Sequence, residues 1–164
     1  MKNRTLFLTI LGLVLLAVII SIYISFKEEK TDLVITKNSK IEDIVYEKNK
    51  VNIYFFWGQG CPHCEELFQF LEDTKGKYAK YYNIYCFEVW NNQTNAQTMD
   101  QFSKVLNDKV GRSVPYLIIG DQSFQGYNKT MNQKILNTIL KESKKTTPDA
   151  IYQSLKENVQ QVEP

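Results

Sequence analysis

Cysteine and histidine are scarce in this chain, with three cysteines and a single histidine among its 164 residues. A small secreted scaffold held by disulfides carries a larger, even number of cysteines in a shorter chain. A tetrahedral metal site usually draws its ligands from two Cys/His clusters, and only one such cluster exists here. The composition therefore argues against a disulfide-stapled scaffold, and we expect no metal and no cofactor.

The sequence also lacks an excess of charge of either sign. Lysine and arginine number 20 and the acidic residues 18, and Lys2 and Arg4 account for the whole difference. From Lys27 onward the two charges balance. A neutral domain offers no electrostatic footprint for a phosphate backbone, so we expect no nucleic-acid partner.

Only one long hydrophobic run is present, at residues 6–26, and it is long enough to cross a bilayer as a helix. Lys2 and Arg4 precede the run, whereas residues 27–30 follow it with no net charge, which favours a cytoplasmic N-terminus. We therefore expect residues 1–5 in the cytoplasm, a single uncleaved transmembrane anchor at 6–26, and the rest of the chain extracytoplasmic at the surface of a bacterial cell. A cleaved signal peptide is the alternative interpretation.

Cys61 and Cys64 lie one helical turn apart, directly after the apolar run 51–56. Pro62 fits the first position of a helix that Cys61 caps. Free amides and the positive end of the helix dipole would then face the Cys61 sulfur and favour its thiolate, the nucleophile of disulfide exchange. We predict that Cys61 is the nucleophile and Cys64 the resolving thiol. A static disulfide is the alternative, although so short a bridge removes little chain entropy.

Three further polar or sulfur-containing residues receive an interpretation. His63, between the two cysteines, can stabilise the neighbouring thiolate by a hydrogen bond or by charge, which makes the disulfide more oxidising; a merely exposed histidine is the alternative. Cys86 falls in the middle of an apolar strand and is interpreted as a buried apolar residue. Glu88 interrupts the same strand, and we expect it to face solvent, with a buried proton relay as the alternative.

Apolar periodicity predicts a domain of alternating strands and helices over 33–145, after a linker at 27–32. The expected strands are 33–35, 51–56, 82–89, 114–119 and 123–127. One helix is expected directly after a capping box at 39–42. Further helices are expected at 62–75, 94–107 and 131–140, and a last helix with a tail in 146–164. This order predicts an α/β fold with a central mixed β-sheet flanked by helices on both faces.

The order of elements, the aromatic strand ending at Trp57, the motif Cys61-Pro62-His63-Cys64 and the pair Val114-Pro115 together resemble the thioredoxin superfamily. The resemblance implies a three-layer thioredoxin-like fold, a cis bond before Pro115 opposite the two cysteines, and substrate contacts by Val114, Pro115 and Trp57. The residues alone leave two alternatives open: Pro115 could be a trans-proline at the start of a strand, and Trp57 could be an ordinary core residue.

The Pro-His dipeptide is similar to that of DsbA-like oxidases, which implies protein thiols or disulfides as substrates and a redox partner in the membrane. Two features depart from that pattern. Phe55 stands where these proteins usually carry a buried acid, so proton transfer to Cys64 needs another group or water, and residues 90–113 hold one helix instead of a large helical insertion. We expect a thiol–disulfide oxidoreductase that acts as an oxidase. A membrane-linked disulfide reductase and a redox-inert accessory module for peptide or bacteriocin export are the alternatives.

Overall fold

The computed structural model describes residues 2–25 and 34–160, with side chains at 10–21 and 34–157. The chain divides into two units, 1–31 and 32–164. The first contains one helix, α1 (Lys2–Ser25). Residue 26 of the expected anchor and the expected linker at 27–32 lie outside the described residues. Within the part of the chain that is described, no helix combines the length and the apolar character that crossing a membrane requires.

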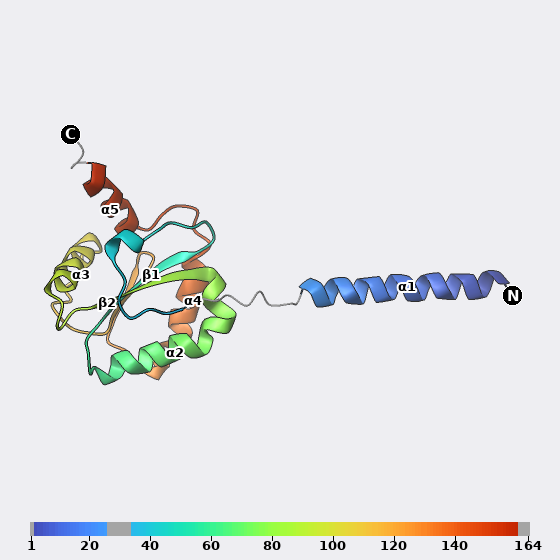
Figure 1. Ribbon diagram of the computed structural model, residues 1–164, viewed down its shortest axis with the longest axis horizontal. Helices are drawn as coiled ribbons and strands as arrows, with labels where there is room; N and C mark the ends of the chain where they lie inside the picture. The colour runs from blue at the N-terminus through green and yellow to red at the C-terminus, as the bar shows by residue number, and fades with distance from the viewer. Residues whose placement is uncertain (1, 26–33, 161–164) are drawn as a thin grey trace. The chain divides into compact units, whose positions relative to one another are not determined.

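The second unit is built on a four-stranded mixed sheet with the strand order β2-β1-β3-β4 (Figure 1). Strand β1 runs parallel to β2 and antiparallel to β3, and β3 pairs with β4 in an antiparallel hairpin. The strands are β1 (Val51–Trp57), β2 (Tyr82–Glu88), β3 (Tyr116–Ile119) and β4 (Gln122–Gln125). The mixed sheet expected from the sequence is therefore confirmed.

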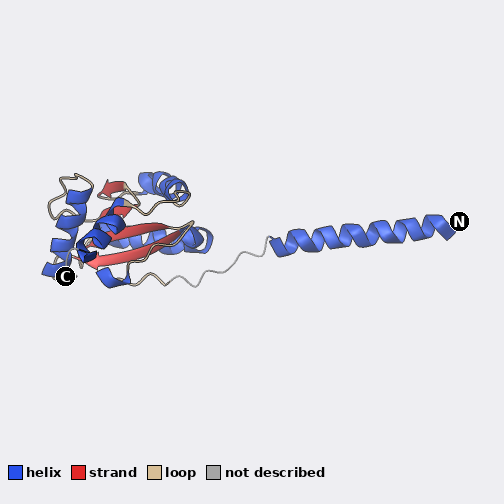
Figure 2. Cartoon of the chain, turned by 90° about the horizontal axis from the view of Figure 1, so that it is seen from above, coloured by secondary structure: helices blue, strands red, loops and turns tan. Residues whose placement is uncertain are grey.

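Helices cover both faces of this sheet, as the view from above shows (Figure 2). They are α2 (Pro62–Tyr78), α3 (Gln93–Val105), α4 (Asn132–Glu142) and α5 (Ala150–Gln160). Three short 3₁₀ turns complete the domain, at Ile41–Asp43, Ala79–Tyr81 and Lys129–Met131. The predicted helix at 62–75 is three residues longer than expected, and the C-terminal tail at 161–164 lies outside the described residues.

Strand β1 is buried on both faces because its side chains alternate between two core clusters. Ile53 and Phe55 belong to the cluster that contains α2 and α4 residues, whereas Tyr54 and Phe56 pack with α3 residues such as Phe102. A nearly continuous apolar strand, with Asn52 as its one polar residue, suits a central position between two helix layers. The site described below lies at the end of this strand, where α2 begins.

The strand expected at 33–35 is wrong for the described residues 34 and 35, which form no strand. Downstream, the segment approaches the edge of β2 at one point, where the Ser39 N–H donates to the Cys86 carbonyl at 2.8 Å. The Cys86 N–H donates to the Ser39 hydroxyl at 3.0 Å instead of to a carbonyl. Because a side chain takes the place of the next ladder bond, pairing stops and no edge strand forms.

The helix expected after the capping box at 39–42 is also wrong, because only the 3₁₀ turn Ile41–Asp43 forms. The carboxylate that accepts the cap N–H belongs to Asp43, which lies 2.8 Å from the Lys40 nitrogen. The backbone becomes extended at Ile44, whose side chain is buried while that of Val45 is exposed. An extended chain points these neighbours to opposite sides, which a continued helix cannot do.

Tyr82, at the start of β2, has a fully buried hydroxyl that makes no hydrogen bond within the described residues. Burial raises the pKa of Tyr82 to about 12. In the unfolded chain tyrosine titrates near pH 10, so the stability that depends on the neutral phenol is present below pH 10 and falls as the pH rises toward 12.

Tyr82→Phe is expected to raise the free energy of unfolding by about 1 kcal/mol at pH 7 and to reduce its alkaline decline, because it removes an unpaired buried polar group. Urea unfolding at pH 7 and pH 11 measures both effects. Tyr54→Phe is the control with the opposite sign, because the Tyr54 hydroxyl donates to Asp149 Oδ1 at 2.9 Å. A less stable Tyr82→Phe at pH 7 would contradict the assignment.

Candidate active site

Cys61 caps the N-terminus of α2, as the sequence predicts. Its extended backbone precedes Pro62 at the first helical position, and its sulfur accepts the Cys64 N–H at 3.2 Å. A turn holds Cys61 on the other side, since its own N–H donates to the Gly58 carbonyl at 3.1 Å. A disulfide joins Cys61 to Cys64, whose Cα atoms are 5.3 Å apart. The sulfur of Cys61 therefore lies where the free amides of a helix favour negative charge.

The two cysteines differ in their access to solvent. Cys61 keeps 4% of its surface exposed, whereas Cys64 is fully buried in the apolar cluster. An external thiolate can therefore approach only Cys61, and Cys64 can act only from within the domain. This asymmetry matches the predicted division into nucleophile and resolving thiol.

The acidic residues of the first turn of α2 both have a basic neighbour. Lys37 Nζ lies 2.9 Å from a Glu65 oxygen, and Nδ1 of His63 lies 3.4 Å from a Glu66 oxygen. His63 is exposed, so the structure places its ring toward Glu66 at the surface. These basic neighbours balance part of the charge of the two glutamates, which would otherwise oppose a Cys61 thiolate.

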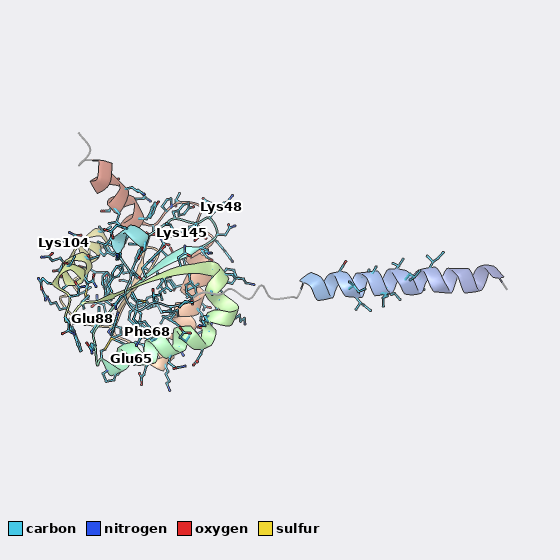
Figure 3. The ribbon with its side chains drawn as sticks, viewed as in Figure 1. Lys48, Glu65, Phe68, Glu88, Lys104 and Lys145 are labelled. Carbon is cyan, nitrogen blue, oxygen red and sulfur yellow. A yellow bond between two sulfur atoms is a disulfide. The ribbon has the colours of Figure 1, made fainter. Side chains whose placement is uncertain are left out.

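Lys37 belongs to the segment before the sheet and reaches the site from a distance in sequence. Its ammonium group lies 4.6 Å from the centre of the Phe68 ring and 5.4 Å from that of Trp57. Its carbonyl accepts the Trp57 indole N–H at 2.9 Å. Figure 3 labels Glu65 and Phe68, which lie near each other on α2. The sequence carries no local signal for this contact, because it joins residues far apart along the chain.

Removing the Lys37 charge is expected to leave Glu65 unbalanced beside the cysteines and to weaken the Cys61 thiolate. We expect Lys37→Met to slow alkylation of reduced Cys61 at pH 6 by about twofold, a small effect because the ion pair is half exposed and screened by solvent. Alkylation followed by mass spectrometry measures the rate.

The double variant Lys37→Met/Glu65→Gln tests the cause of that effect. If the charge of Glu65 is responsible, neutralising it restores the alkylation rate. A double variant that remains as slow as Lys37→Met would show that packing on Phe68, and not charge, is at work.

The other residues with predicted substrate contacts lie at the start of β3 and at the end of β1. The Val114–Pro115 bond is cis, as the resemblance implies. Val114 is half buried and packs against the cluster that contains Cys61 and Cys64. Trp57 is buried, with its ring edge-on to Phe68, so it is also part of the core. The structure brings these residues to the same end of the sheet as the disulfide, and their contact with substrate remains a prediction.

Phe55 and Cys86 are both fully buried and are paired across β1 and β2. The Phe55 ring packs against Phe68 with centroids 4.5 Å apart, so an aromatic contact occupies the place of a buried acid. Cys86 is a free thiol, and burial raises its pKa well above the ordinary value. Cys86 is thus an inert apolar residue, as predicted.

The expectation that Glu88 faces solvent is wrong, because only 8% of its surface is exposed. Its carboxylate accepts three backbone N–H groups, those of Gln59 at 3.2 Å, Trp90 at 3.1 Å and Asn91 at 2.9 Å. Glu88 therefore ties the loop that precedes Cys61 to the loop that follows β2. The sequence marks Glu88 as unusual, because a charged residue ends an apolar strand. It does not show which N–H groups donate to the Glu88 carboxylate.

Among the described residues, no three His, Cys, Asp or Glu side chains gather into a possible metal site. What the arrangement can do is disulfide chemistry. A solvent-reachable sulfur at a helix N-terminus is joined to a second sulfur that is held within the same helical turn.

No protein-family model and no curated protein matches the chain. Among solved structures, it is similar to a glutaredoxin of Archaeoglobus fulgidus, with 21% identity over 55% of this chain and 85% of that one and a TM-score of 0.36. It is also similar to the thioredoxin Mala s 13 of Malassezia sympodialis, with 15% identity over 58% of this chain and 77% of that one and a TM-score of 0.39. An uncharacterised thioredoxin-like protein of Clostridium perfringens has 18% identity over 74% of this chain and 91% of that one, with a TM-score of 0.44.

The fold is thioredoxin-like by its own topology. The sheet has the order β2-β1-β3-β4, the CxxC pair opens the helix that follows β1, and a cis-proline precedes β3. Two features on which the sequence resembles the superfamily are in place, the CxxC pair at the start of the helix after β1 and the proline after Val114, whereas the strand expected at 33–35 does not form at residues 34 and 35.

Proposed function

We propose that this protein is a thiol–disulfide oxidoreductase that oxidises protein thiols with its Cys61–Cys64 disulfide. The observation that carries the proposal is the capping geometry, in which the Cys61 sulfur accepts the Cys64 N–H at 3.2 Å at the start of α2. The same amide and the helix dipole stabilise the Cys61 thiolate that reduction produces. A stabilised thiolate favours the reduced form, and the disulfide is correspondingly oxidising.

The reaction is two successive exchanges. A substrate thiolate attacks Sγ of Cys61, the Cys61–Cys64 bond breaks, and the electron pair goes to the Cys64 sulfur, which takes up a proton. A second substrate thiolate then attacks the substrate sulfur of the mixed disulfide, so that the substrate disulfide forms and Cys61 leaves as a thiolate. Two electrons have passed from the substrate dithiol to the protein, and exchange with the disulfide of a partner protein returns the cysteines to their oxidised state.

The charges around the first turn of α2 support the oxidising direction. Glu65 is paired with Lys37, and Glu66 faces His63, which carries a positive charge when protonated. Neither glutamate then opposes the Cys61 thiolate with its full charge. His63 thus acts on the thiolate through Glu66 as well as through its own position beside Cys61.

The proposal includes a cellular location. On the sequence alone, and without a spanning helix found among the described residues, residues 6–26 would anchor the protein in the cell membrane, with Lys2 and Arg4 in the cytoplasm and the domain with the cysteines outside. A protein that oxidises thiols outside the cytoplasm needs a partner to accept its electrons, and an anchored domain would meet such a partner at the membrane. Labelling of intact cells with a thiol reagent that does not cross membranes tests the orientation.

A redox titration of the full chain against glutathione distinguishes the proposed oxidase from its alternatives. A reduction potential near or above about −180 mV supports the oxidase, and one near −270 mV supports a reductase supplied with electrons through the membrane. If the protein is instead a redox-inert accessory module for peptide export, cells are expected to keep full function when Cys61 is replaced by serine.

A further inference from the structure

Trp90, in the loop after β2, is an aromatic residue that the fold leaves uncovered. Half of its surface is exposed (52%), and among the aromatic residues whose side chains are described it alone is exposed. A single exposed apolar side chain is common on protein surfaces and means little by itself. Trp90 differs from such residues in its contact with the loop that leads to Cys61.

The Trp90 ring is held against the loop that leads to the disulfide. It lies directly on Gly58, where an added Cβ would overlap the indole. The Trp90 N–H donates to Glu88 Oε1 at 3.1 Å, and the same oxygen accepts the Gln59 N–H at 3.2 Å. Ring and loop are therefore one unit, with Glu88 at its centre; Figure 3 labels Glu88.

This unit is adjacent to the reactive sulfur. The Gly58 carbonyl, next to the contact with Trp90, accepts the Cys61 N–H at 3.1 Å. Gly58 is hydrogen-bonded to Cys61 and lies three residues before it, so a protein segment whose thiolate reaches Cys61 passes close to the loop that holds Trp90. At about 3.3 Å per residue of extended chain, a side chain one or two positions from the reacting cysteine reaches the neighbouring loop.

The two loops around the ring are joined by amide groups. The Glu88 carboxylate accepts backbone N–H groups, and the side-chain amides of Gln59 and Asn91 bond to each other at 3.4 Å. The exposed indole offers apolar area and a ring for stacking, so it favours an aromatic or large aliphatic side chain over glycine.

We infer that Trp90 is a specificity-determining residue that contacts substrate. It selects protein segments that carry an aromatic or large aliphatic side chain within two residues of the reacting cysteine. The inference rests on the proposed function, because it concerns the substrate of the same disulfide.

Two reduced peptides test it. They have the same length and charge and contain two cysteines each, and they differ only in a phenylalanine or a glycine two positions before the first cysteine. The oxidised full chain is mixed with each peptide, and acid quenching with mass spectrometry gives the rate of peptide oxidation. Each rate is divided by that for dithiothreitol, which reports on the disulfide itself and is too small to span the two loops.

The wild-type chain is expected to oxidise the phenylalanine peptide about tenfold faster than the glycine peptide. Trp90→Ala and Gly58→Ala, which displaces the ring, both remove this difference, and Trp90→Phe keeps part of it. Val105→Ala, which shortens another exposed apolar side chain, keeps the full preference. Equal rates for both peptides with the wild-type chain overturn the inference and leave the proposed function intact. If neither peptide is oxidised, both fall.

Discussion

Cys61→Ser abolishes disulfide exchange. Without the sulfur at the helix cap, no mixed disulfide with substrate can form, because Cys64 is fully buried and out of reach of an external thiolate. The rate of oxidation of a reduced protein substrate is expected to fall to the uncatalysed background, a loss on the order of a thousandfold or more, as when other enzymes lose their nucleophile. Single-turnover oxidation followed by mass spectrometry measures it.

Cys64→Ser gives a different result, and the difference tests the assigned roles. Given a substrate that carries a disulfide, this variant attacks it with the Cys61 thiolate and releases one substrate thiolate. Because no Cys64 thiol is present to displace the bound substrate, the mixed disulfide between Cys61 and the substrate accumulates. Cys86→Ala is the matched control, because Cys86 is a buried free thiol outside the exchange; this variant forms the wild-type products. Adducts on Cys61→Ser but none on Cys64→Ser would mean that the two roles are reversed.

Glu88→Leu produces the largest loss of stability that we expect around the site. The carboxylate is buried and accepts N–H groups from Gln59, Trp90 and Asn91, which a leucine leaves unpaired. Removing the acceptor of these three part-buried N–H groups lowers the free energy of unfolding by about 2–4 kcal/mol in total. Urea unfolding of the oxidised chain gives the value.

Glu88→Gln is the conservative partner of that variant, because its amide oxygen still accepts hydrogen bonds at one of the two positions. It is expected to lose less than half as much stability as Glu88→Leu. The exposed Glu65→Gln is the control for a lost carboxylate elsewhere on the same face, and it changes stability by less than about 0.5 kcal/mol. If Glu88→Leu were as stable as Glu65→Gln, the conclusion that Glu88 holds the two loops together would be wrong.

The central strand and its helices follow from local pattern. A nearly continuous apolar run, interrupted only by Asn52, is typical of a strand between two helix layers, and β1 extends one residue beyond the predicted 51–56. The errors lie where a short segment depends on a partner. The strand expected at 33–35 does not form at residues 34 and 35. Further along, the Ser39 hydroxyl takes the place of a carbonyl in pairing with Cys86, and a three-residue apolar pattern does not contain that information.

The same distinction holds for the site. The cap at Cys61 is predictable because Pro62 and the spacing of the cysteines are local features. Lys37 and Trp90 reach the site from other parts of the chain, and each is placed by a contact across the fold, with Phe68 and Gly58 respectively. Glu88 shows the intermediate case, in which the sequence marks an unusual residue and only the structure identifies the amides that hold it.

The titration of the Cys61 thiol in the reduced full chain tests most directly whether the helix cap activates this sulfur. The rate of alkylation at Cys61 is followed against pH by mass spectrometry, with Cys64→Ser as the variant in which no second thiol competes. We predict that the pKa of Cys61 lies well below the value of about 8.5 of a free cysteine, because the amides and the dipole of α2 stabilise the thiolate. A Cys61 thiol that titrates at or above the free value would contradict the account.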